Sequence, residues 1–337
     1  MFYIILKSRF VSARSKFFKM NLLQLIAKEK DGFSFGESWR YSKDSLVAVV
    51  PILRKSLKRR NYLVLSETKN VQIKDTGQIN KVELVNNEKK PIYIRQGEIF
   101  SGKTQERTAI RSYVVMPGES VRIEVRCIYA SKGINIGETM TTGGFTTSSF
   151  DTTFNRCSYK TRNVEQRDVW KEVNVNSSNL SDRTINYLDS TGSILNGTTW
   201  NFSDDLKGNI ENFSKVIDKV LKSVPHFKNQ VGIATLDLKG VSGIECFDLK
   251  DSWKAIRENI IKKEGEQLVK EEKNSPFEYN KKKAKNSIKG VLLSDFEEKV
   301  IFKSKDYRVI VLKNDNFIGE MTLLKDNPIH LTLVRNK

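Results

Sequence analysis

The sequence is poor in the residues that build disulfide frameworks and metal sites. Its 337 residues include only 3 cysteines and 2 histidines, and an odd, small number of cysteines favours a reducing compartment over a disulfide framework. None of these residues has the C-x-x-C or H-x-x-x-H spacing that is typical of zinc ligands. We therefore predict no metal site and no cofactor.

Long apolar runs are also missing. No run approaches the ~20 residues of a transmembrane helix, so we predict no membrane span and a cytoplasmic protein. Residues 1–19 form a basic tail in which the apolar block precedes the positive charges, the reverse of a signal peptide. The tail faintly resembles an organellar presequence, but we favour a start codon misassigned ahead of Met20, or a dangling extension.

The most informative stretch is residues 97–107, GEIFSGKTQER, because it fits two incompatible templates. Gly97, Gly102, Lys103 and Thr104 complete the phosphate-loop pattern G-x-x-x-x-G-K-T. In that pattern backbone N–H groups and the lysine bind phosphates, and the threonine hydroxyl binds Mg²⁺. This template predicts an NTPase.

The residues downstream favour the second template, a loop between strands. A phosphate loop leads into a helix, but residues 108–116 are rich in β-branched and aromatic side chains and end at Pro117-Gly118. Beyond that turn, apolar residues alternate with polar ones up to Cys127, as in a half-buried antiparallel strand. We therefore predict strand, glycine-containing loop, strand, turn and strand, with the P-loop NTPase as an alternative.

Under this template the motif resembles the core of a known family. Gly97-Glu98, Gly102, Gln105 and Arg107, followed by a turn and a strand that leads into a cysteine, match the G-E-x-x-x-G-x-x-Q-x-R signature of the ARG and Rhodanese-Phosphatase-superfamily-associated Protein domain. Looser matches extend the resemblance over about residues 40–337. These matches are Gln166-Arg167, Val169-Trp170, the segment from Val231 to Phe247, and Ile329-His330. The family's acidic residue and Arg-Trp pair after the cysteine are replaced here by Ile128-Tyr129-Ala130.

The resemblance implies a function and a candidate site. The family name records association with ADP-ribosylglycohydrolase and with rhodanese or phosphatase partners, which implies a ligand-binding or accessory role linked to NAD/ADP-ribose metabolism. The candidate ligand-binding residues are Gly97, Glu98, Gly102, Gln105 and Arg107. They suit a small anionic or nucleotide-like ligand; the competing interpretation is an internal salt bridge that only braces the loop. The sequence contains no complete catalytic constellation, so we assign no activity.

The formal charge of +18 raises a second alternative, a basic protein that binds nucleic acid. Outside the tail the basic residues form two clusters, and the candidate contacts in them are Arg59, Arg60, Lys281, Lys282 and Lys283. No RRM, KH or zinc-finger signature accompanies them, and the aromatic residues are not interleaved with the basic runs. Nucleic acid is therefore the less favoured partner, and solvated loop charges are the simpler explanation.

The overall pattern predicts an α+β fold with a mainly antiparallel β core and a few packed helices. We divide the chain into the tail 1–19, a β-rich first half over 20–130, a Gly/Thr/Ser-rich loop insertion over 131–163, and an α+β second half over 164–337. Helices are predicted over 213–221 and from Asp251 onward, and short strands over 92–94, 290–293 and 329–334, among others. Within these elements Cys127 is predicted to be a buried structural cysteine, and His330 alone cannot make a catalytic triad.

Overall fold

The computed structural model describes residues 22–56, 58–102, 106–128, 137, 139–161, 163–173, 221–268 and 280–336. These residues form mainly antiparallel sheets with packed helices, which confirms the predicted α+β class. Within the described part of the chain there are three sheets, of nine, six and three strands.

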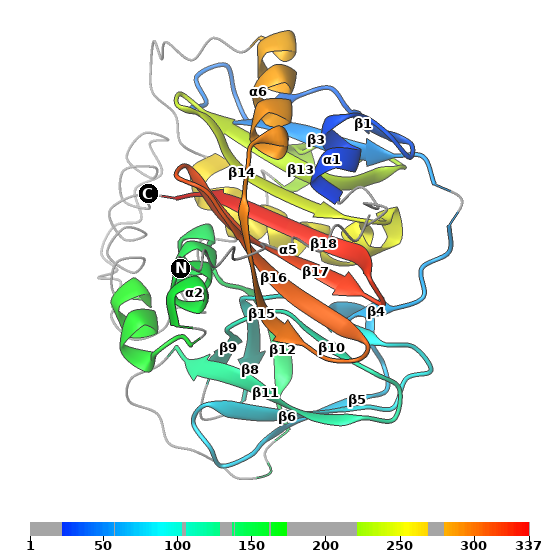
Figure 1. Ribbon diagram of the computed structural model, residues 1–337, viewed down its shortest axis with the longest axis vertical. Coiled ribbons are helices and arrows are strands. Elements are labelled where there is room, and N and C mark those ends of the chain that lie inside the picture. Colours follow the sequence, from blue (N-terminus) through cyan, green and yellow to red (C-terminus); the bar gives the residue numbers. More distant parts are fainter. Residues whose placement is uncertain are drawn as a thin grey trace, which may run out of the picture.

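The nine-stranded sheet is built from both ends of the described chain (Figure 1). Its path, in spatial order, is β1 (Phe33–Phe35), β3 (Ala48–Arg54), β13 (Gln230–Asp237), β14 (Gly240–Phe247), β18 (Asn327–Arg335), β17 (Phe317–Leu324), β16 (Tyr307–Lys313) and β15 (Glu297–Lys303), with β2 (Trp39–Arg40) also paired to β3. All neighbours on this path pair antiparallel. Successive side chains of these strands pack into different cores, as in Ile233 and Ala234, so both faces of the sheet are buried.

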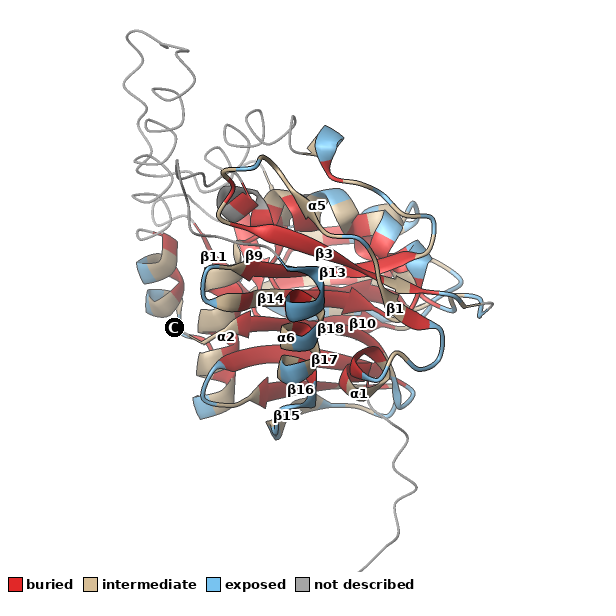
Figure 2. Cartoon of the chain, turned by 90° about the horizontal axis from the view of Figure 1, so that it is seen from above, coloured by how far each residue is buried: buried red, intermediate tan, exposed pale blue. Residues whose placement is uncertain are grey.

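Different helices cover the two faces. On one face α1 (Leu22–Ala27) and α6 (Lys281–Leu293) pack together through the apolar residues Leu22, Ile26 and Ile288. On the other face α5 (Lys250–Leu268) buries the stripe that includes Trp253, Ile256 and Ile260. Figure 2 shows how much of the sheet these layers bury.

The two smaller sheets pack beside α5, on the same side of the large sheet. The six-stranded sheet has the order β12 (Thr141–Phe145), β8 (Glu98–Ser101), β9 (Glu106–Ala109), β11 (Ser120–Cys127), β6 (Lys81–Asn86) and β5 (Val71–Asp75). The three-stranded sheet has the order β10 (Tyr113–Val115), β7 (Ile92–Ile94) and β4 (Leu63–Val64). Strand β4 leads directly into the short 3₁₀ helix η1 (Leu65–Glu67). Tyr93 of β7 shares one hydrophobic core with Phe247 of the large sheet and Trp253 of α5. The seam between the sheets is therefore a packed interior.

The prediction of a loop over residues 131–163 is wrong for much of this range. Within it, residues 141–145 form β12, and Ser148–Thr161 form the helix α2. The Ser- and Thr-rich composition suggested a loop because these residues are weak helix formers. The helix is held by Phe150 and Phe154, one turn apart and both buried against Ile99.

A second correction concerns the end of α6. Residues 290–293 were predicted as a strand, but they complete the helix that begins at Lys281. Ala284, Ile288 and Leu292 are buried at helical spacing, and this period extends across the residues that looked β-prone. The strands at 92–94 and in the last segment, and the helix after Asp251, are confirmed. The tail 1–19 and most of the predicted helix 213–221 lie outside the described residues.

Among the described residues, no helix is both long and apolar enough to cross a membrane.

Candidate functional site

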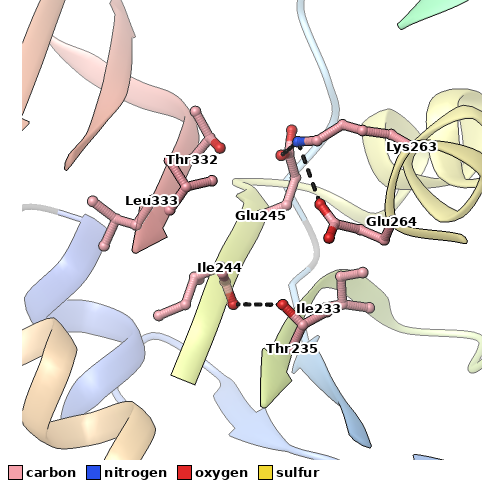
Figure 3. Close-up of a pocket in the computed structure, with 10 residues that line it drawn as sticks. Ile233, Thr235, Ile244, Glu245, Lys263, Glu264, Thr332 and Leu333 are labelled. Carbon is pink, nitrogen blue, oxygen red and sulfur yellow. Dashed lines mark hydrogen bonds and ion pairs between the residues drawn. The ribbon is translucent and has the colours of Figure 1, made fainter. Parts of the chain in front are cut away.

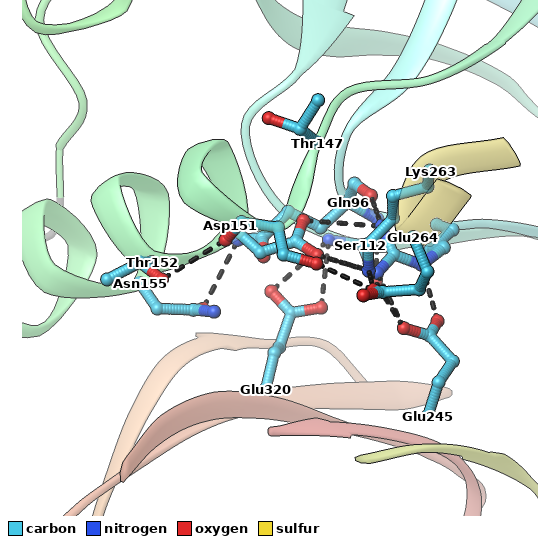
Figure 4. A network of polar contacts seen from close by, with 12 residues as sticks. Gln96, Ser112, Thr147, Asp151, Thr152, Asn155, Glu245, Lys263, Glu264 and Glu320 are labelled. Carbon is cyan, nitrogen blue, oxygen red and sulfur yellow. Dashed lines mark hydrogen bonds and ion pairs between the residues drawn. The ribbon is translucent and has the colours of Figure 1, made fainter. Parts of the chain in front are cut away.

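A cluster of ionisable and polar side chains is buried at the seam between the large sheet and the smaller sheets (Figure 4). It draws residues from β7 and the turn after it, from the segment between β9 and β10, from α2 and α5, and from β14, β17 and β18. We call it the seam cluster, and its members are Tyr93, Arg95, Ser112, Asp151, Glu245, Lys263, Glu264, Glu320 and His330. None of them is more than 7% exposed.

Arg95 lies at the centre of the seam cluster, and all of its N–H groups are used. Its Nε and Nη2 donate to the two carboxylate oxygens of Glu245 at 2.6 and 2.8 Å. Nη2 and Nη1 donate to Asp151 at 2.8 and 3.3 Å, and Nη1 also donates to the carbonyl of Gln96. Burial disfavours the charged guanidinium, but the carboxylates of Asp151 and Glu245 raise the pKa of Arg95 well above its ordinary value.

Lys263 is the second cation of the cluster. Its Nζ lies 2.7 Å from Asp151 Oδ2, 3.1 Å from Glu245 Oε2 and 3.5 Å from Glu264 Oε1. Burial and Arg95 lower the pKa of Lys263, but the three carboxylates outweigh them and raise it. Conversely, burial would raise the pKa of Glu245, yet Arg95 and Lys263 hold it well below its usual range. Both cations are therefore occupied by carboxylates from inside the protein.

A hydroxyl–imidazole–carboxylate chain joins the same cluster. His330 Nε2 lies 2.8 Å from Glu245 Oε1, and His330 Nδ1 lies 2.7 Å from the hydroxyl of Tyr93. Burial lowers the pKa of His330, so the ring is neutral; donation from Nε2 to Glu245 leaves Nδ1 to accept from Tyr93. The Tyr93 hydroxyl in turn lies 3.0 Å from Ser112 Oγ, and Ser112 N donates to Glu320 at 3.2 Å. His330, which could not make a triad alone, is thus part of a buried relay.

Glu98, the acid of the sequence motif, is buried beside this cluster. It is 1% exposed, and its Oε1 has no hydrogen-bond partner among the described residues. Burial raises the pKa of Glu98 to about 8, and the nearby Arg95 only partly offsets this. Glu98 is therefore mostly a neutral carboxylic acid at pH 7, able to donate a hydrogen bond.

Gly97 explains why the motif needs glycine at this point. Its φ is +81°, in the left-handed region, and a Cβ here would lie 2.5 Å from Thr146 Oγ1 and 3.4 Å from Arg95 Nη1. The backbone of the motif therefore packs directly against the central arginine and its partner Asp151. Both reasons that favour glycine, a left-handed backbone and a close approach, apply at this residue.

Other polar atoms near Glu98 also lack partners. Gln96 Nε2 donates to Asn155 Oδ1 at 3.2 Å, but Gln96 Oε1 and Asn155 Nδ2 have no partner among the described residues. The same is true of Thr146 Oγ1, the atom that a Cβ on Gly97 would touch. Buried polar atoms without partners are uncommon, and a bound water or ligand is one way in which such atoms are satisfied.

A small cavity borders the other side of the seam cluster (Figure 3). Glu245, Lys263 and Glu264 line it together with Thr235 and Thr332, and its volume is about 10 Å³. That is close to the minimum space for one water molecule.

Arg107, the arginine of the motif, has its described contacts elsewhere. Its Nη2 donates to Asp75 Oδ2 at 2.6 Å, and its Nη1 donates to the carbonyls of Gln78 and Lys81 at 3.2 and 3.0 Å. These contacts tie β9 to the end of β5 and to the turn before β6, as the bracing interpretation predicts. Gly102 follows β8 and is half-buried, and Gln105 lies outside the described residues. The structure therefore brings Glu98 and Gly97 to the seam cluster, whereas the contacts of Arg107 hold the six-stranded sheet.

The P-loop alternative is wrong. Lys103 and Thr104 lie outside the described residues, but the elements on either side are strands: β8 pairs antiparallel with β9, with Ile99 opposite Thr108. A phosphate loop needs a helix after the loop, whose N-terminus helps to bind the anion.

The basic candidates occupy two separate places. Arg60 is largely buried, with Nη2 at 2.5 Å from Glu67, and Arg59 is exposed. The other candidates, Lys281, Lys282 and Lys283, are exposed in the first turn of α6, a helix where a loop was expected. Lys281 pairs with Glu37 at 3.0 Å.

The sequence pointed to Glu98 but missed most of the seam cluster. The missed acids of the sheet, Glu245 and Glu320, stand within otherwise apolar strands, in the runs Ile244-Glu245-Cys246 and Gly319-Glu320-Met321. A charged residue in a strand that is buried on both faces must have a partner. The position of these two acids in the sequence could therefore have indicated a buried polar cluster. No comparable signal marks Asp151 or Lys263.

The fold and the seam define an α+β protein whose sheets are joined by a buried ionic network. A family model matches residues 32–334, and it is that of the ARG and Rhodanese-Phosphatase-superfamily-associated Protein domain. The chain belongs to this family. No curated protein and no solved structure matches the chain.

Proposed function

We propose that this protein is a cytosolic ligand-binding or accessory component linked to NAD/ADP-ribose metabolism, and that its ligand is recognised beside Glu98 at the seam cluster. The link to this metabolism comes from the association that the family name records. The observation that carries the binding role is Glu98 itself: a fully buried carboxyl group with an unpartnered oxygen next to a saturated ionic network.

The energetics support a role beyond holding the sheets together. Burying two cations and their carboxylates carries a desolvation cost that their mutual attraction offsets only when the geometry is very good. Apolar side chains of similar volume would join the sheets at least as well. Clusters of buried ionisable groups with shifted pKa values are typical of functional sites.

The chemistry of the unpartnered atoms indicates which groups of a ligand would bind. Arg95 and Lys263 are already occupied by carboxylates, so neither is free for a phosphate. What remains are neutral groups: the protonated Glu98 and the amides and hydroxyl of Gln96, Asn155 and Thr146. These groups complement hydroxyls and carboxamides, which occur in the ribose and nicotinamide parts of NAD-type ligands.

The test is a ligand-induced melting shift that depends on Glu98. ADP-ribose and NAD should raise the melting temperature of the wild-type protein, because a ligand that binds only the folded state stabilises it, by about 2.7 kcal/mol at a hundredfold excess over Kd. Glu98→Leu should abolish the shift and leave the unliganded protein at least as stable, because it removes an unsatisfied buried oxygen. Glu298→Leu, a change at an exposed position of β15, is the matched control and should retain the shift.

Two results would refute the proposal. One is the absence of a shift with both compounds at millimolar concentration. The other is a shift of equal size in the wild type and in Glu98→Leu, which would place the ligand elsewhere on the protein.

A further inference from the structure

A hollow lies at one end of the large sheet, between two hairpin turns. Residues 303–307 join β15 to β16, and Lys325-Asp326 join β17 to β18. Together with Arg308 they line this open hollow, whose volume is about 570 Å³. This volume is within the range of about 300–1,000 Å³ that is typical of small-molecule sites.

The two turns are held in a fixed relation. Strands β16 and β17 pair so that Tyr307 lies opposite Leu324, and the N–H of Lys325 donates to the carbonyl of Asp306 at 2.7 Å. Within the first turn, Ser304 Oγ accepts from the N–H groups of Asp306 and Tyr307 at 3.2 and 3.1 Å. The walls of the hollow are therefore backbone that is already hydrogen-bonded, and a ligand would find them preformed.

The hollow is rich in cationic side chains. Four of its lining residues are basic and two are acidic, and the basic ones are Lys303, Lys305, Arg308 and Lys325. The three lysines are exposed. Arg308 donates from Nη2 to Asp326 at 2.6 Å, and its side chain remains 34% exposed. A planar guanidinium that is paired on one side and still partly exposed can donate to a phosphate oxygen.

The residues of the turn between β17 and β18 are not those that its backbone conformation favours. Lys325 has φ +47° and Asp326 has φ +63°, so both adopt the left-handed conformation in which a two-residue hairpin turn favours Asn-Gly. Asp tolerates this conformation, but Lys rarely adopts it. Lysine at this position therefore costs the turn conformational energy, but it places a cation at the edge of the hollow. Such a local cost is expected at a residue that serves binding.

We propose that this hollow is a binding site for a small phosphate-bearing molecule, with phosphate oxygens accepting hydrogen bonds from Lys303, Lys305, Lys325 and Arg308. The concave shape and limited volume favour a small molecule over the continuous backbone of a nucleic acid. The site is separate from the seam cluster, whose cations have no capacity left for phosphate.

The probes are inorganic pyrophosphate and ADP, titrated by calorimetry and by melting shift. Both should bind the wild type, and Lys305→Gln and Lys325→Gly should each weaken binding at least tenfold. Lys325→Gly should also raise the melting temperature of the unliganded protein, because glycine suits the left-handed turn. Lys281→Gln removes an equal charge at the distant α6 and should leave the affinity unchanged.

Three results would overturn this site. They are no binding of either probe by the wild type at millimolar concentration, unchanged affinity in both turn variants, or loss of binding that is equal in Lys281→Gln.

A duplex oligonucleotide is a third probe, which tests for nucleic-acid binding at the same surface. If it binds the wild type, is lost in the turn variants, and neither small probe binds, the surface is a nucleic-acid contact and the small-molecule site is refuted. These outcomes are independent of the Glu98 experiment, since no residue of the hollow belongs to the seam cluster.

Discussion

At the scale of single residues, two buried carboxyl groups among the described residues, Glu98 and Glu320, should contribute to how stability depends on pH. Burial raises the pKa of Glu98 to about 8 and that of Glu320 to about 7. Both values lie above the ordinary pKa of a glutamate in the unfolded chain, about 4.3. Such groups contribute stability that is fully present below the unfolded pKa and is lost as pH rises through the folded pKa.

We therefore predict that the free energy of unfolding falls as pH rises from about 5 to 8, by at most about 1.4 kcal/mol per pH unit for each carboxyl group. Glu98→Gln keeps the shape of the side chain but cannot ionise, so it should flatten this slope. The measurement is the urea midpoint at a series of pH values. Glu298→Gln, at an exposed position, should reproduce the wild-type slope; a steep slope retained in Glu98→Gln would contradict the assignment.

At the scale of secondary structure, Arg107 acts as a brace within the six-stranded sheet. It joins β9 to the carboxylate of Asp75 at the end of β5, to the carbonyl of Gln78 in the adjacent turn and to the carbonyl of Lys81 at the start of β6. Both members of the ion pair are almost completely buried. Removing the arginine leaves an uncompensated buried charge on Asp75, a change that typically costs about 3–5 kcal/mol.

We predict that Arg107→Met lowers stability by this order and that Arg107→Met combined with Asp75→Leu recovers much of it. A double-mutant cycle of urea unfolding measures both effects. The melting shift with ADP-ribose, compared between wild type and the double variant, separates bracing from binding. An unaltered shift fits a brace, whereas its loss in a stable double variant would show that Arg107 contacts the ligand.

Individual strands and helices also show which parts of the fold could be predicted from the sequence. Helix α5 was predicted because its apolar residues recur at helical spacing, and strand β7 because Ile92, Tyr93 and Ile94 form a short run of β-prone residues. Helix α2 was missed because its sequence, SSFDTTFNRCSYKT, has few good helix formers, and tertiary contacts such as the packing of Phe150 and Phe154 stabilise it. The single predicted strand over 108–116 is two strands, since the chain bends at Ile110 and Arg111. Ser112, which follows the bend, lies against Tyr93 and Glu320.

The candidate site was only partly predictable for a related reason. Gly97 and Glu98 were found because they belong to a local motif. The central pair, Arg95 and Glu245, is separated by 150 positions along the chain, and Asp151 lies on the helix that was missed. A site assembled from different elements has no local spacing to recognise, so its members could be named only once the strand order was known.

At the scale of the whole molecule, the seam cluster links the large sheet to the smaller ones. Arg95 follows β7 of the three-stranded sheet, Glu245 lies on the large sheet, and Asp151 lies on α2, so one guanidinium joins three parts of the fold. Hydrophobic contacts cross the same seam, as between Tyr93 and Phe247. The charged network and the shared apolar core therefore have to form together.

We predict that Arg95→Met destabilises the whole protein by about 3–5 kcal/mol, because it leaves Asp151 and Glu245 to share a single buried cation, Lys263. Adding Asp151→Asn should recover part of this loss by removing one of the uncompensated charges. The measurement is urea unfolding followed by both tryptophan fluorescence and circular dichroism, which should report one coincident transition in the wild type.

The control for this change is an ion pair of the same geometry in a different environment. Arg335 binds Asp237 through two hydrogen bonds of 2.7 and 2.9 Å, but both side chains are partly exposed, at 19% and 28%. Exposed pairs are worth about 0–1 kcal/mol, so Arg335→Met should cost much less than Arg95→Met. If the two variants lose the same stability, water must reach the seam in solution, and the argument that its carboxylates saturate both cations in a dry interior would fail.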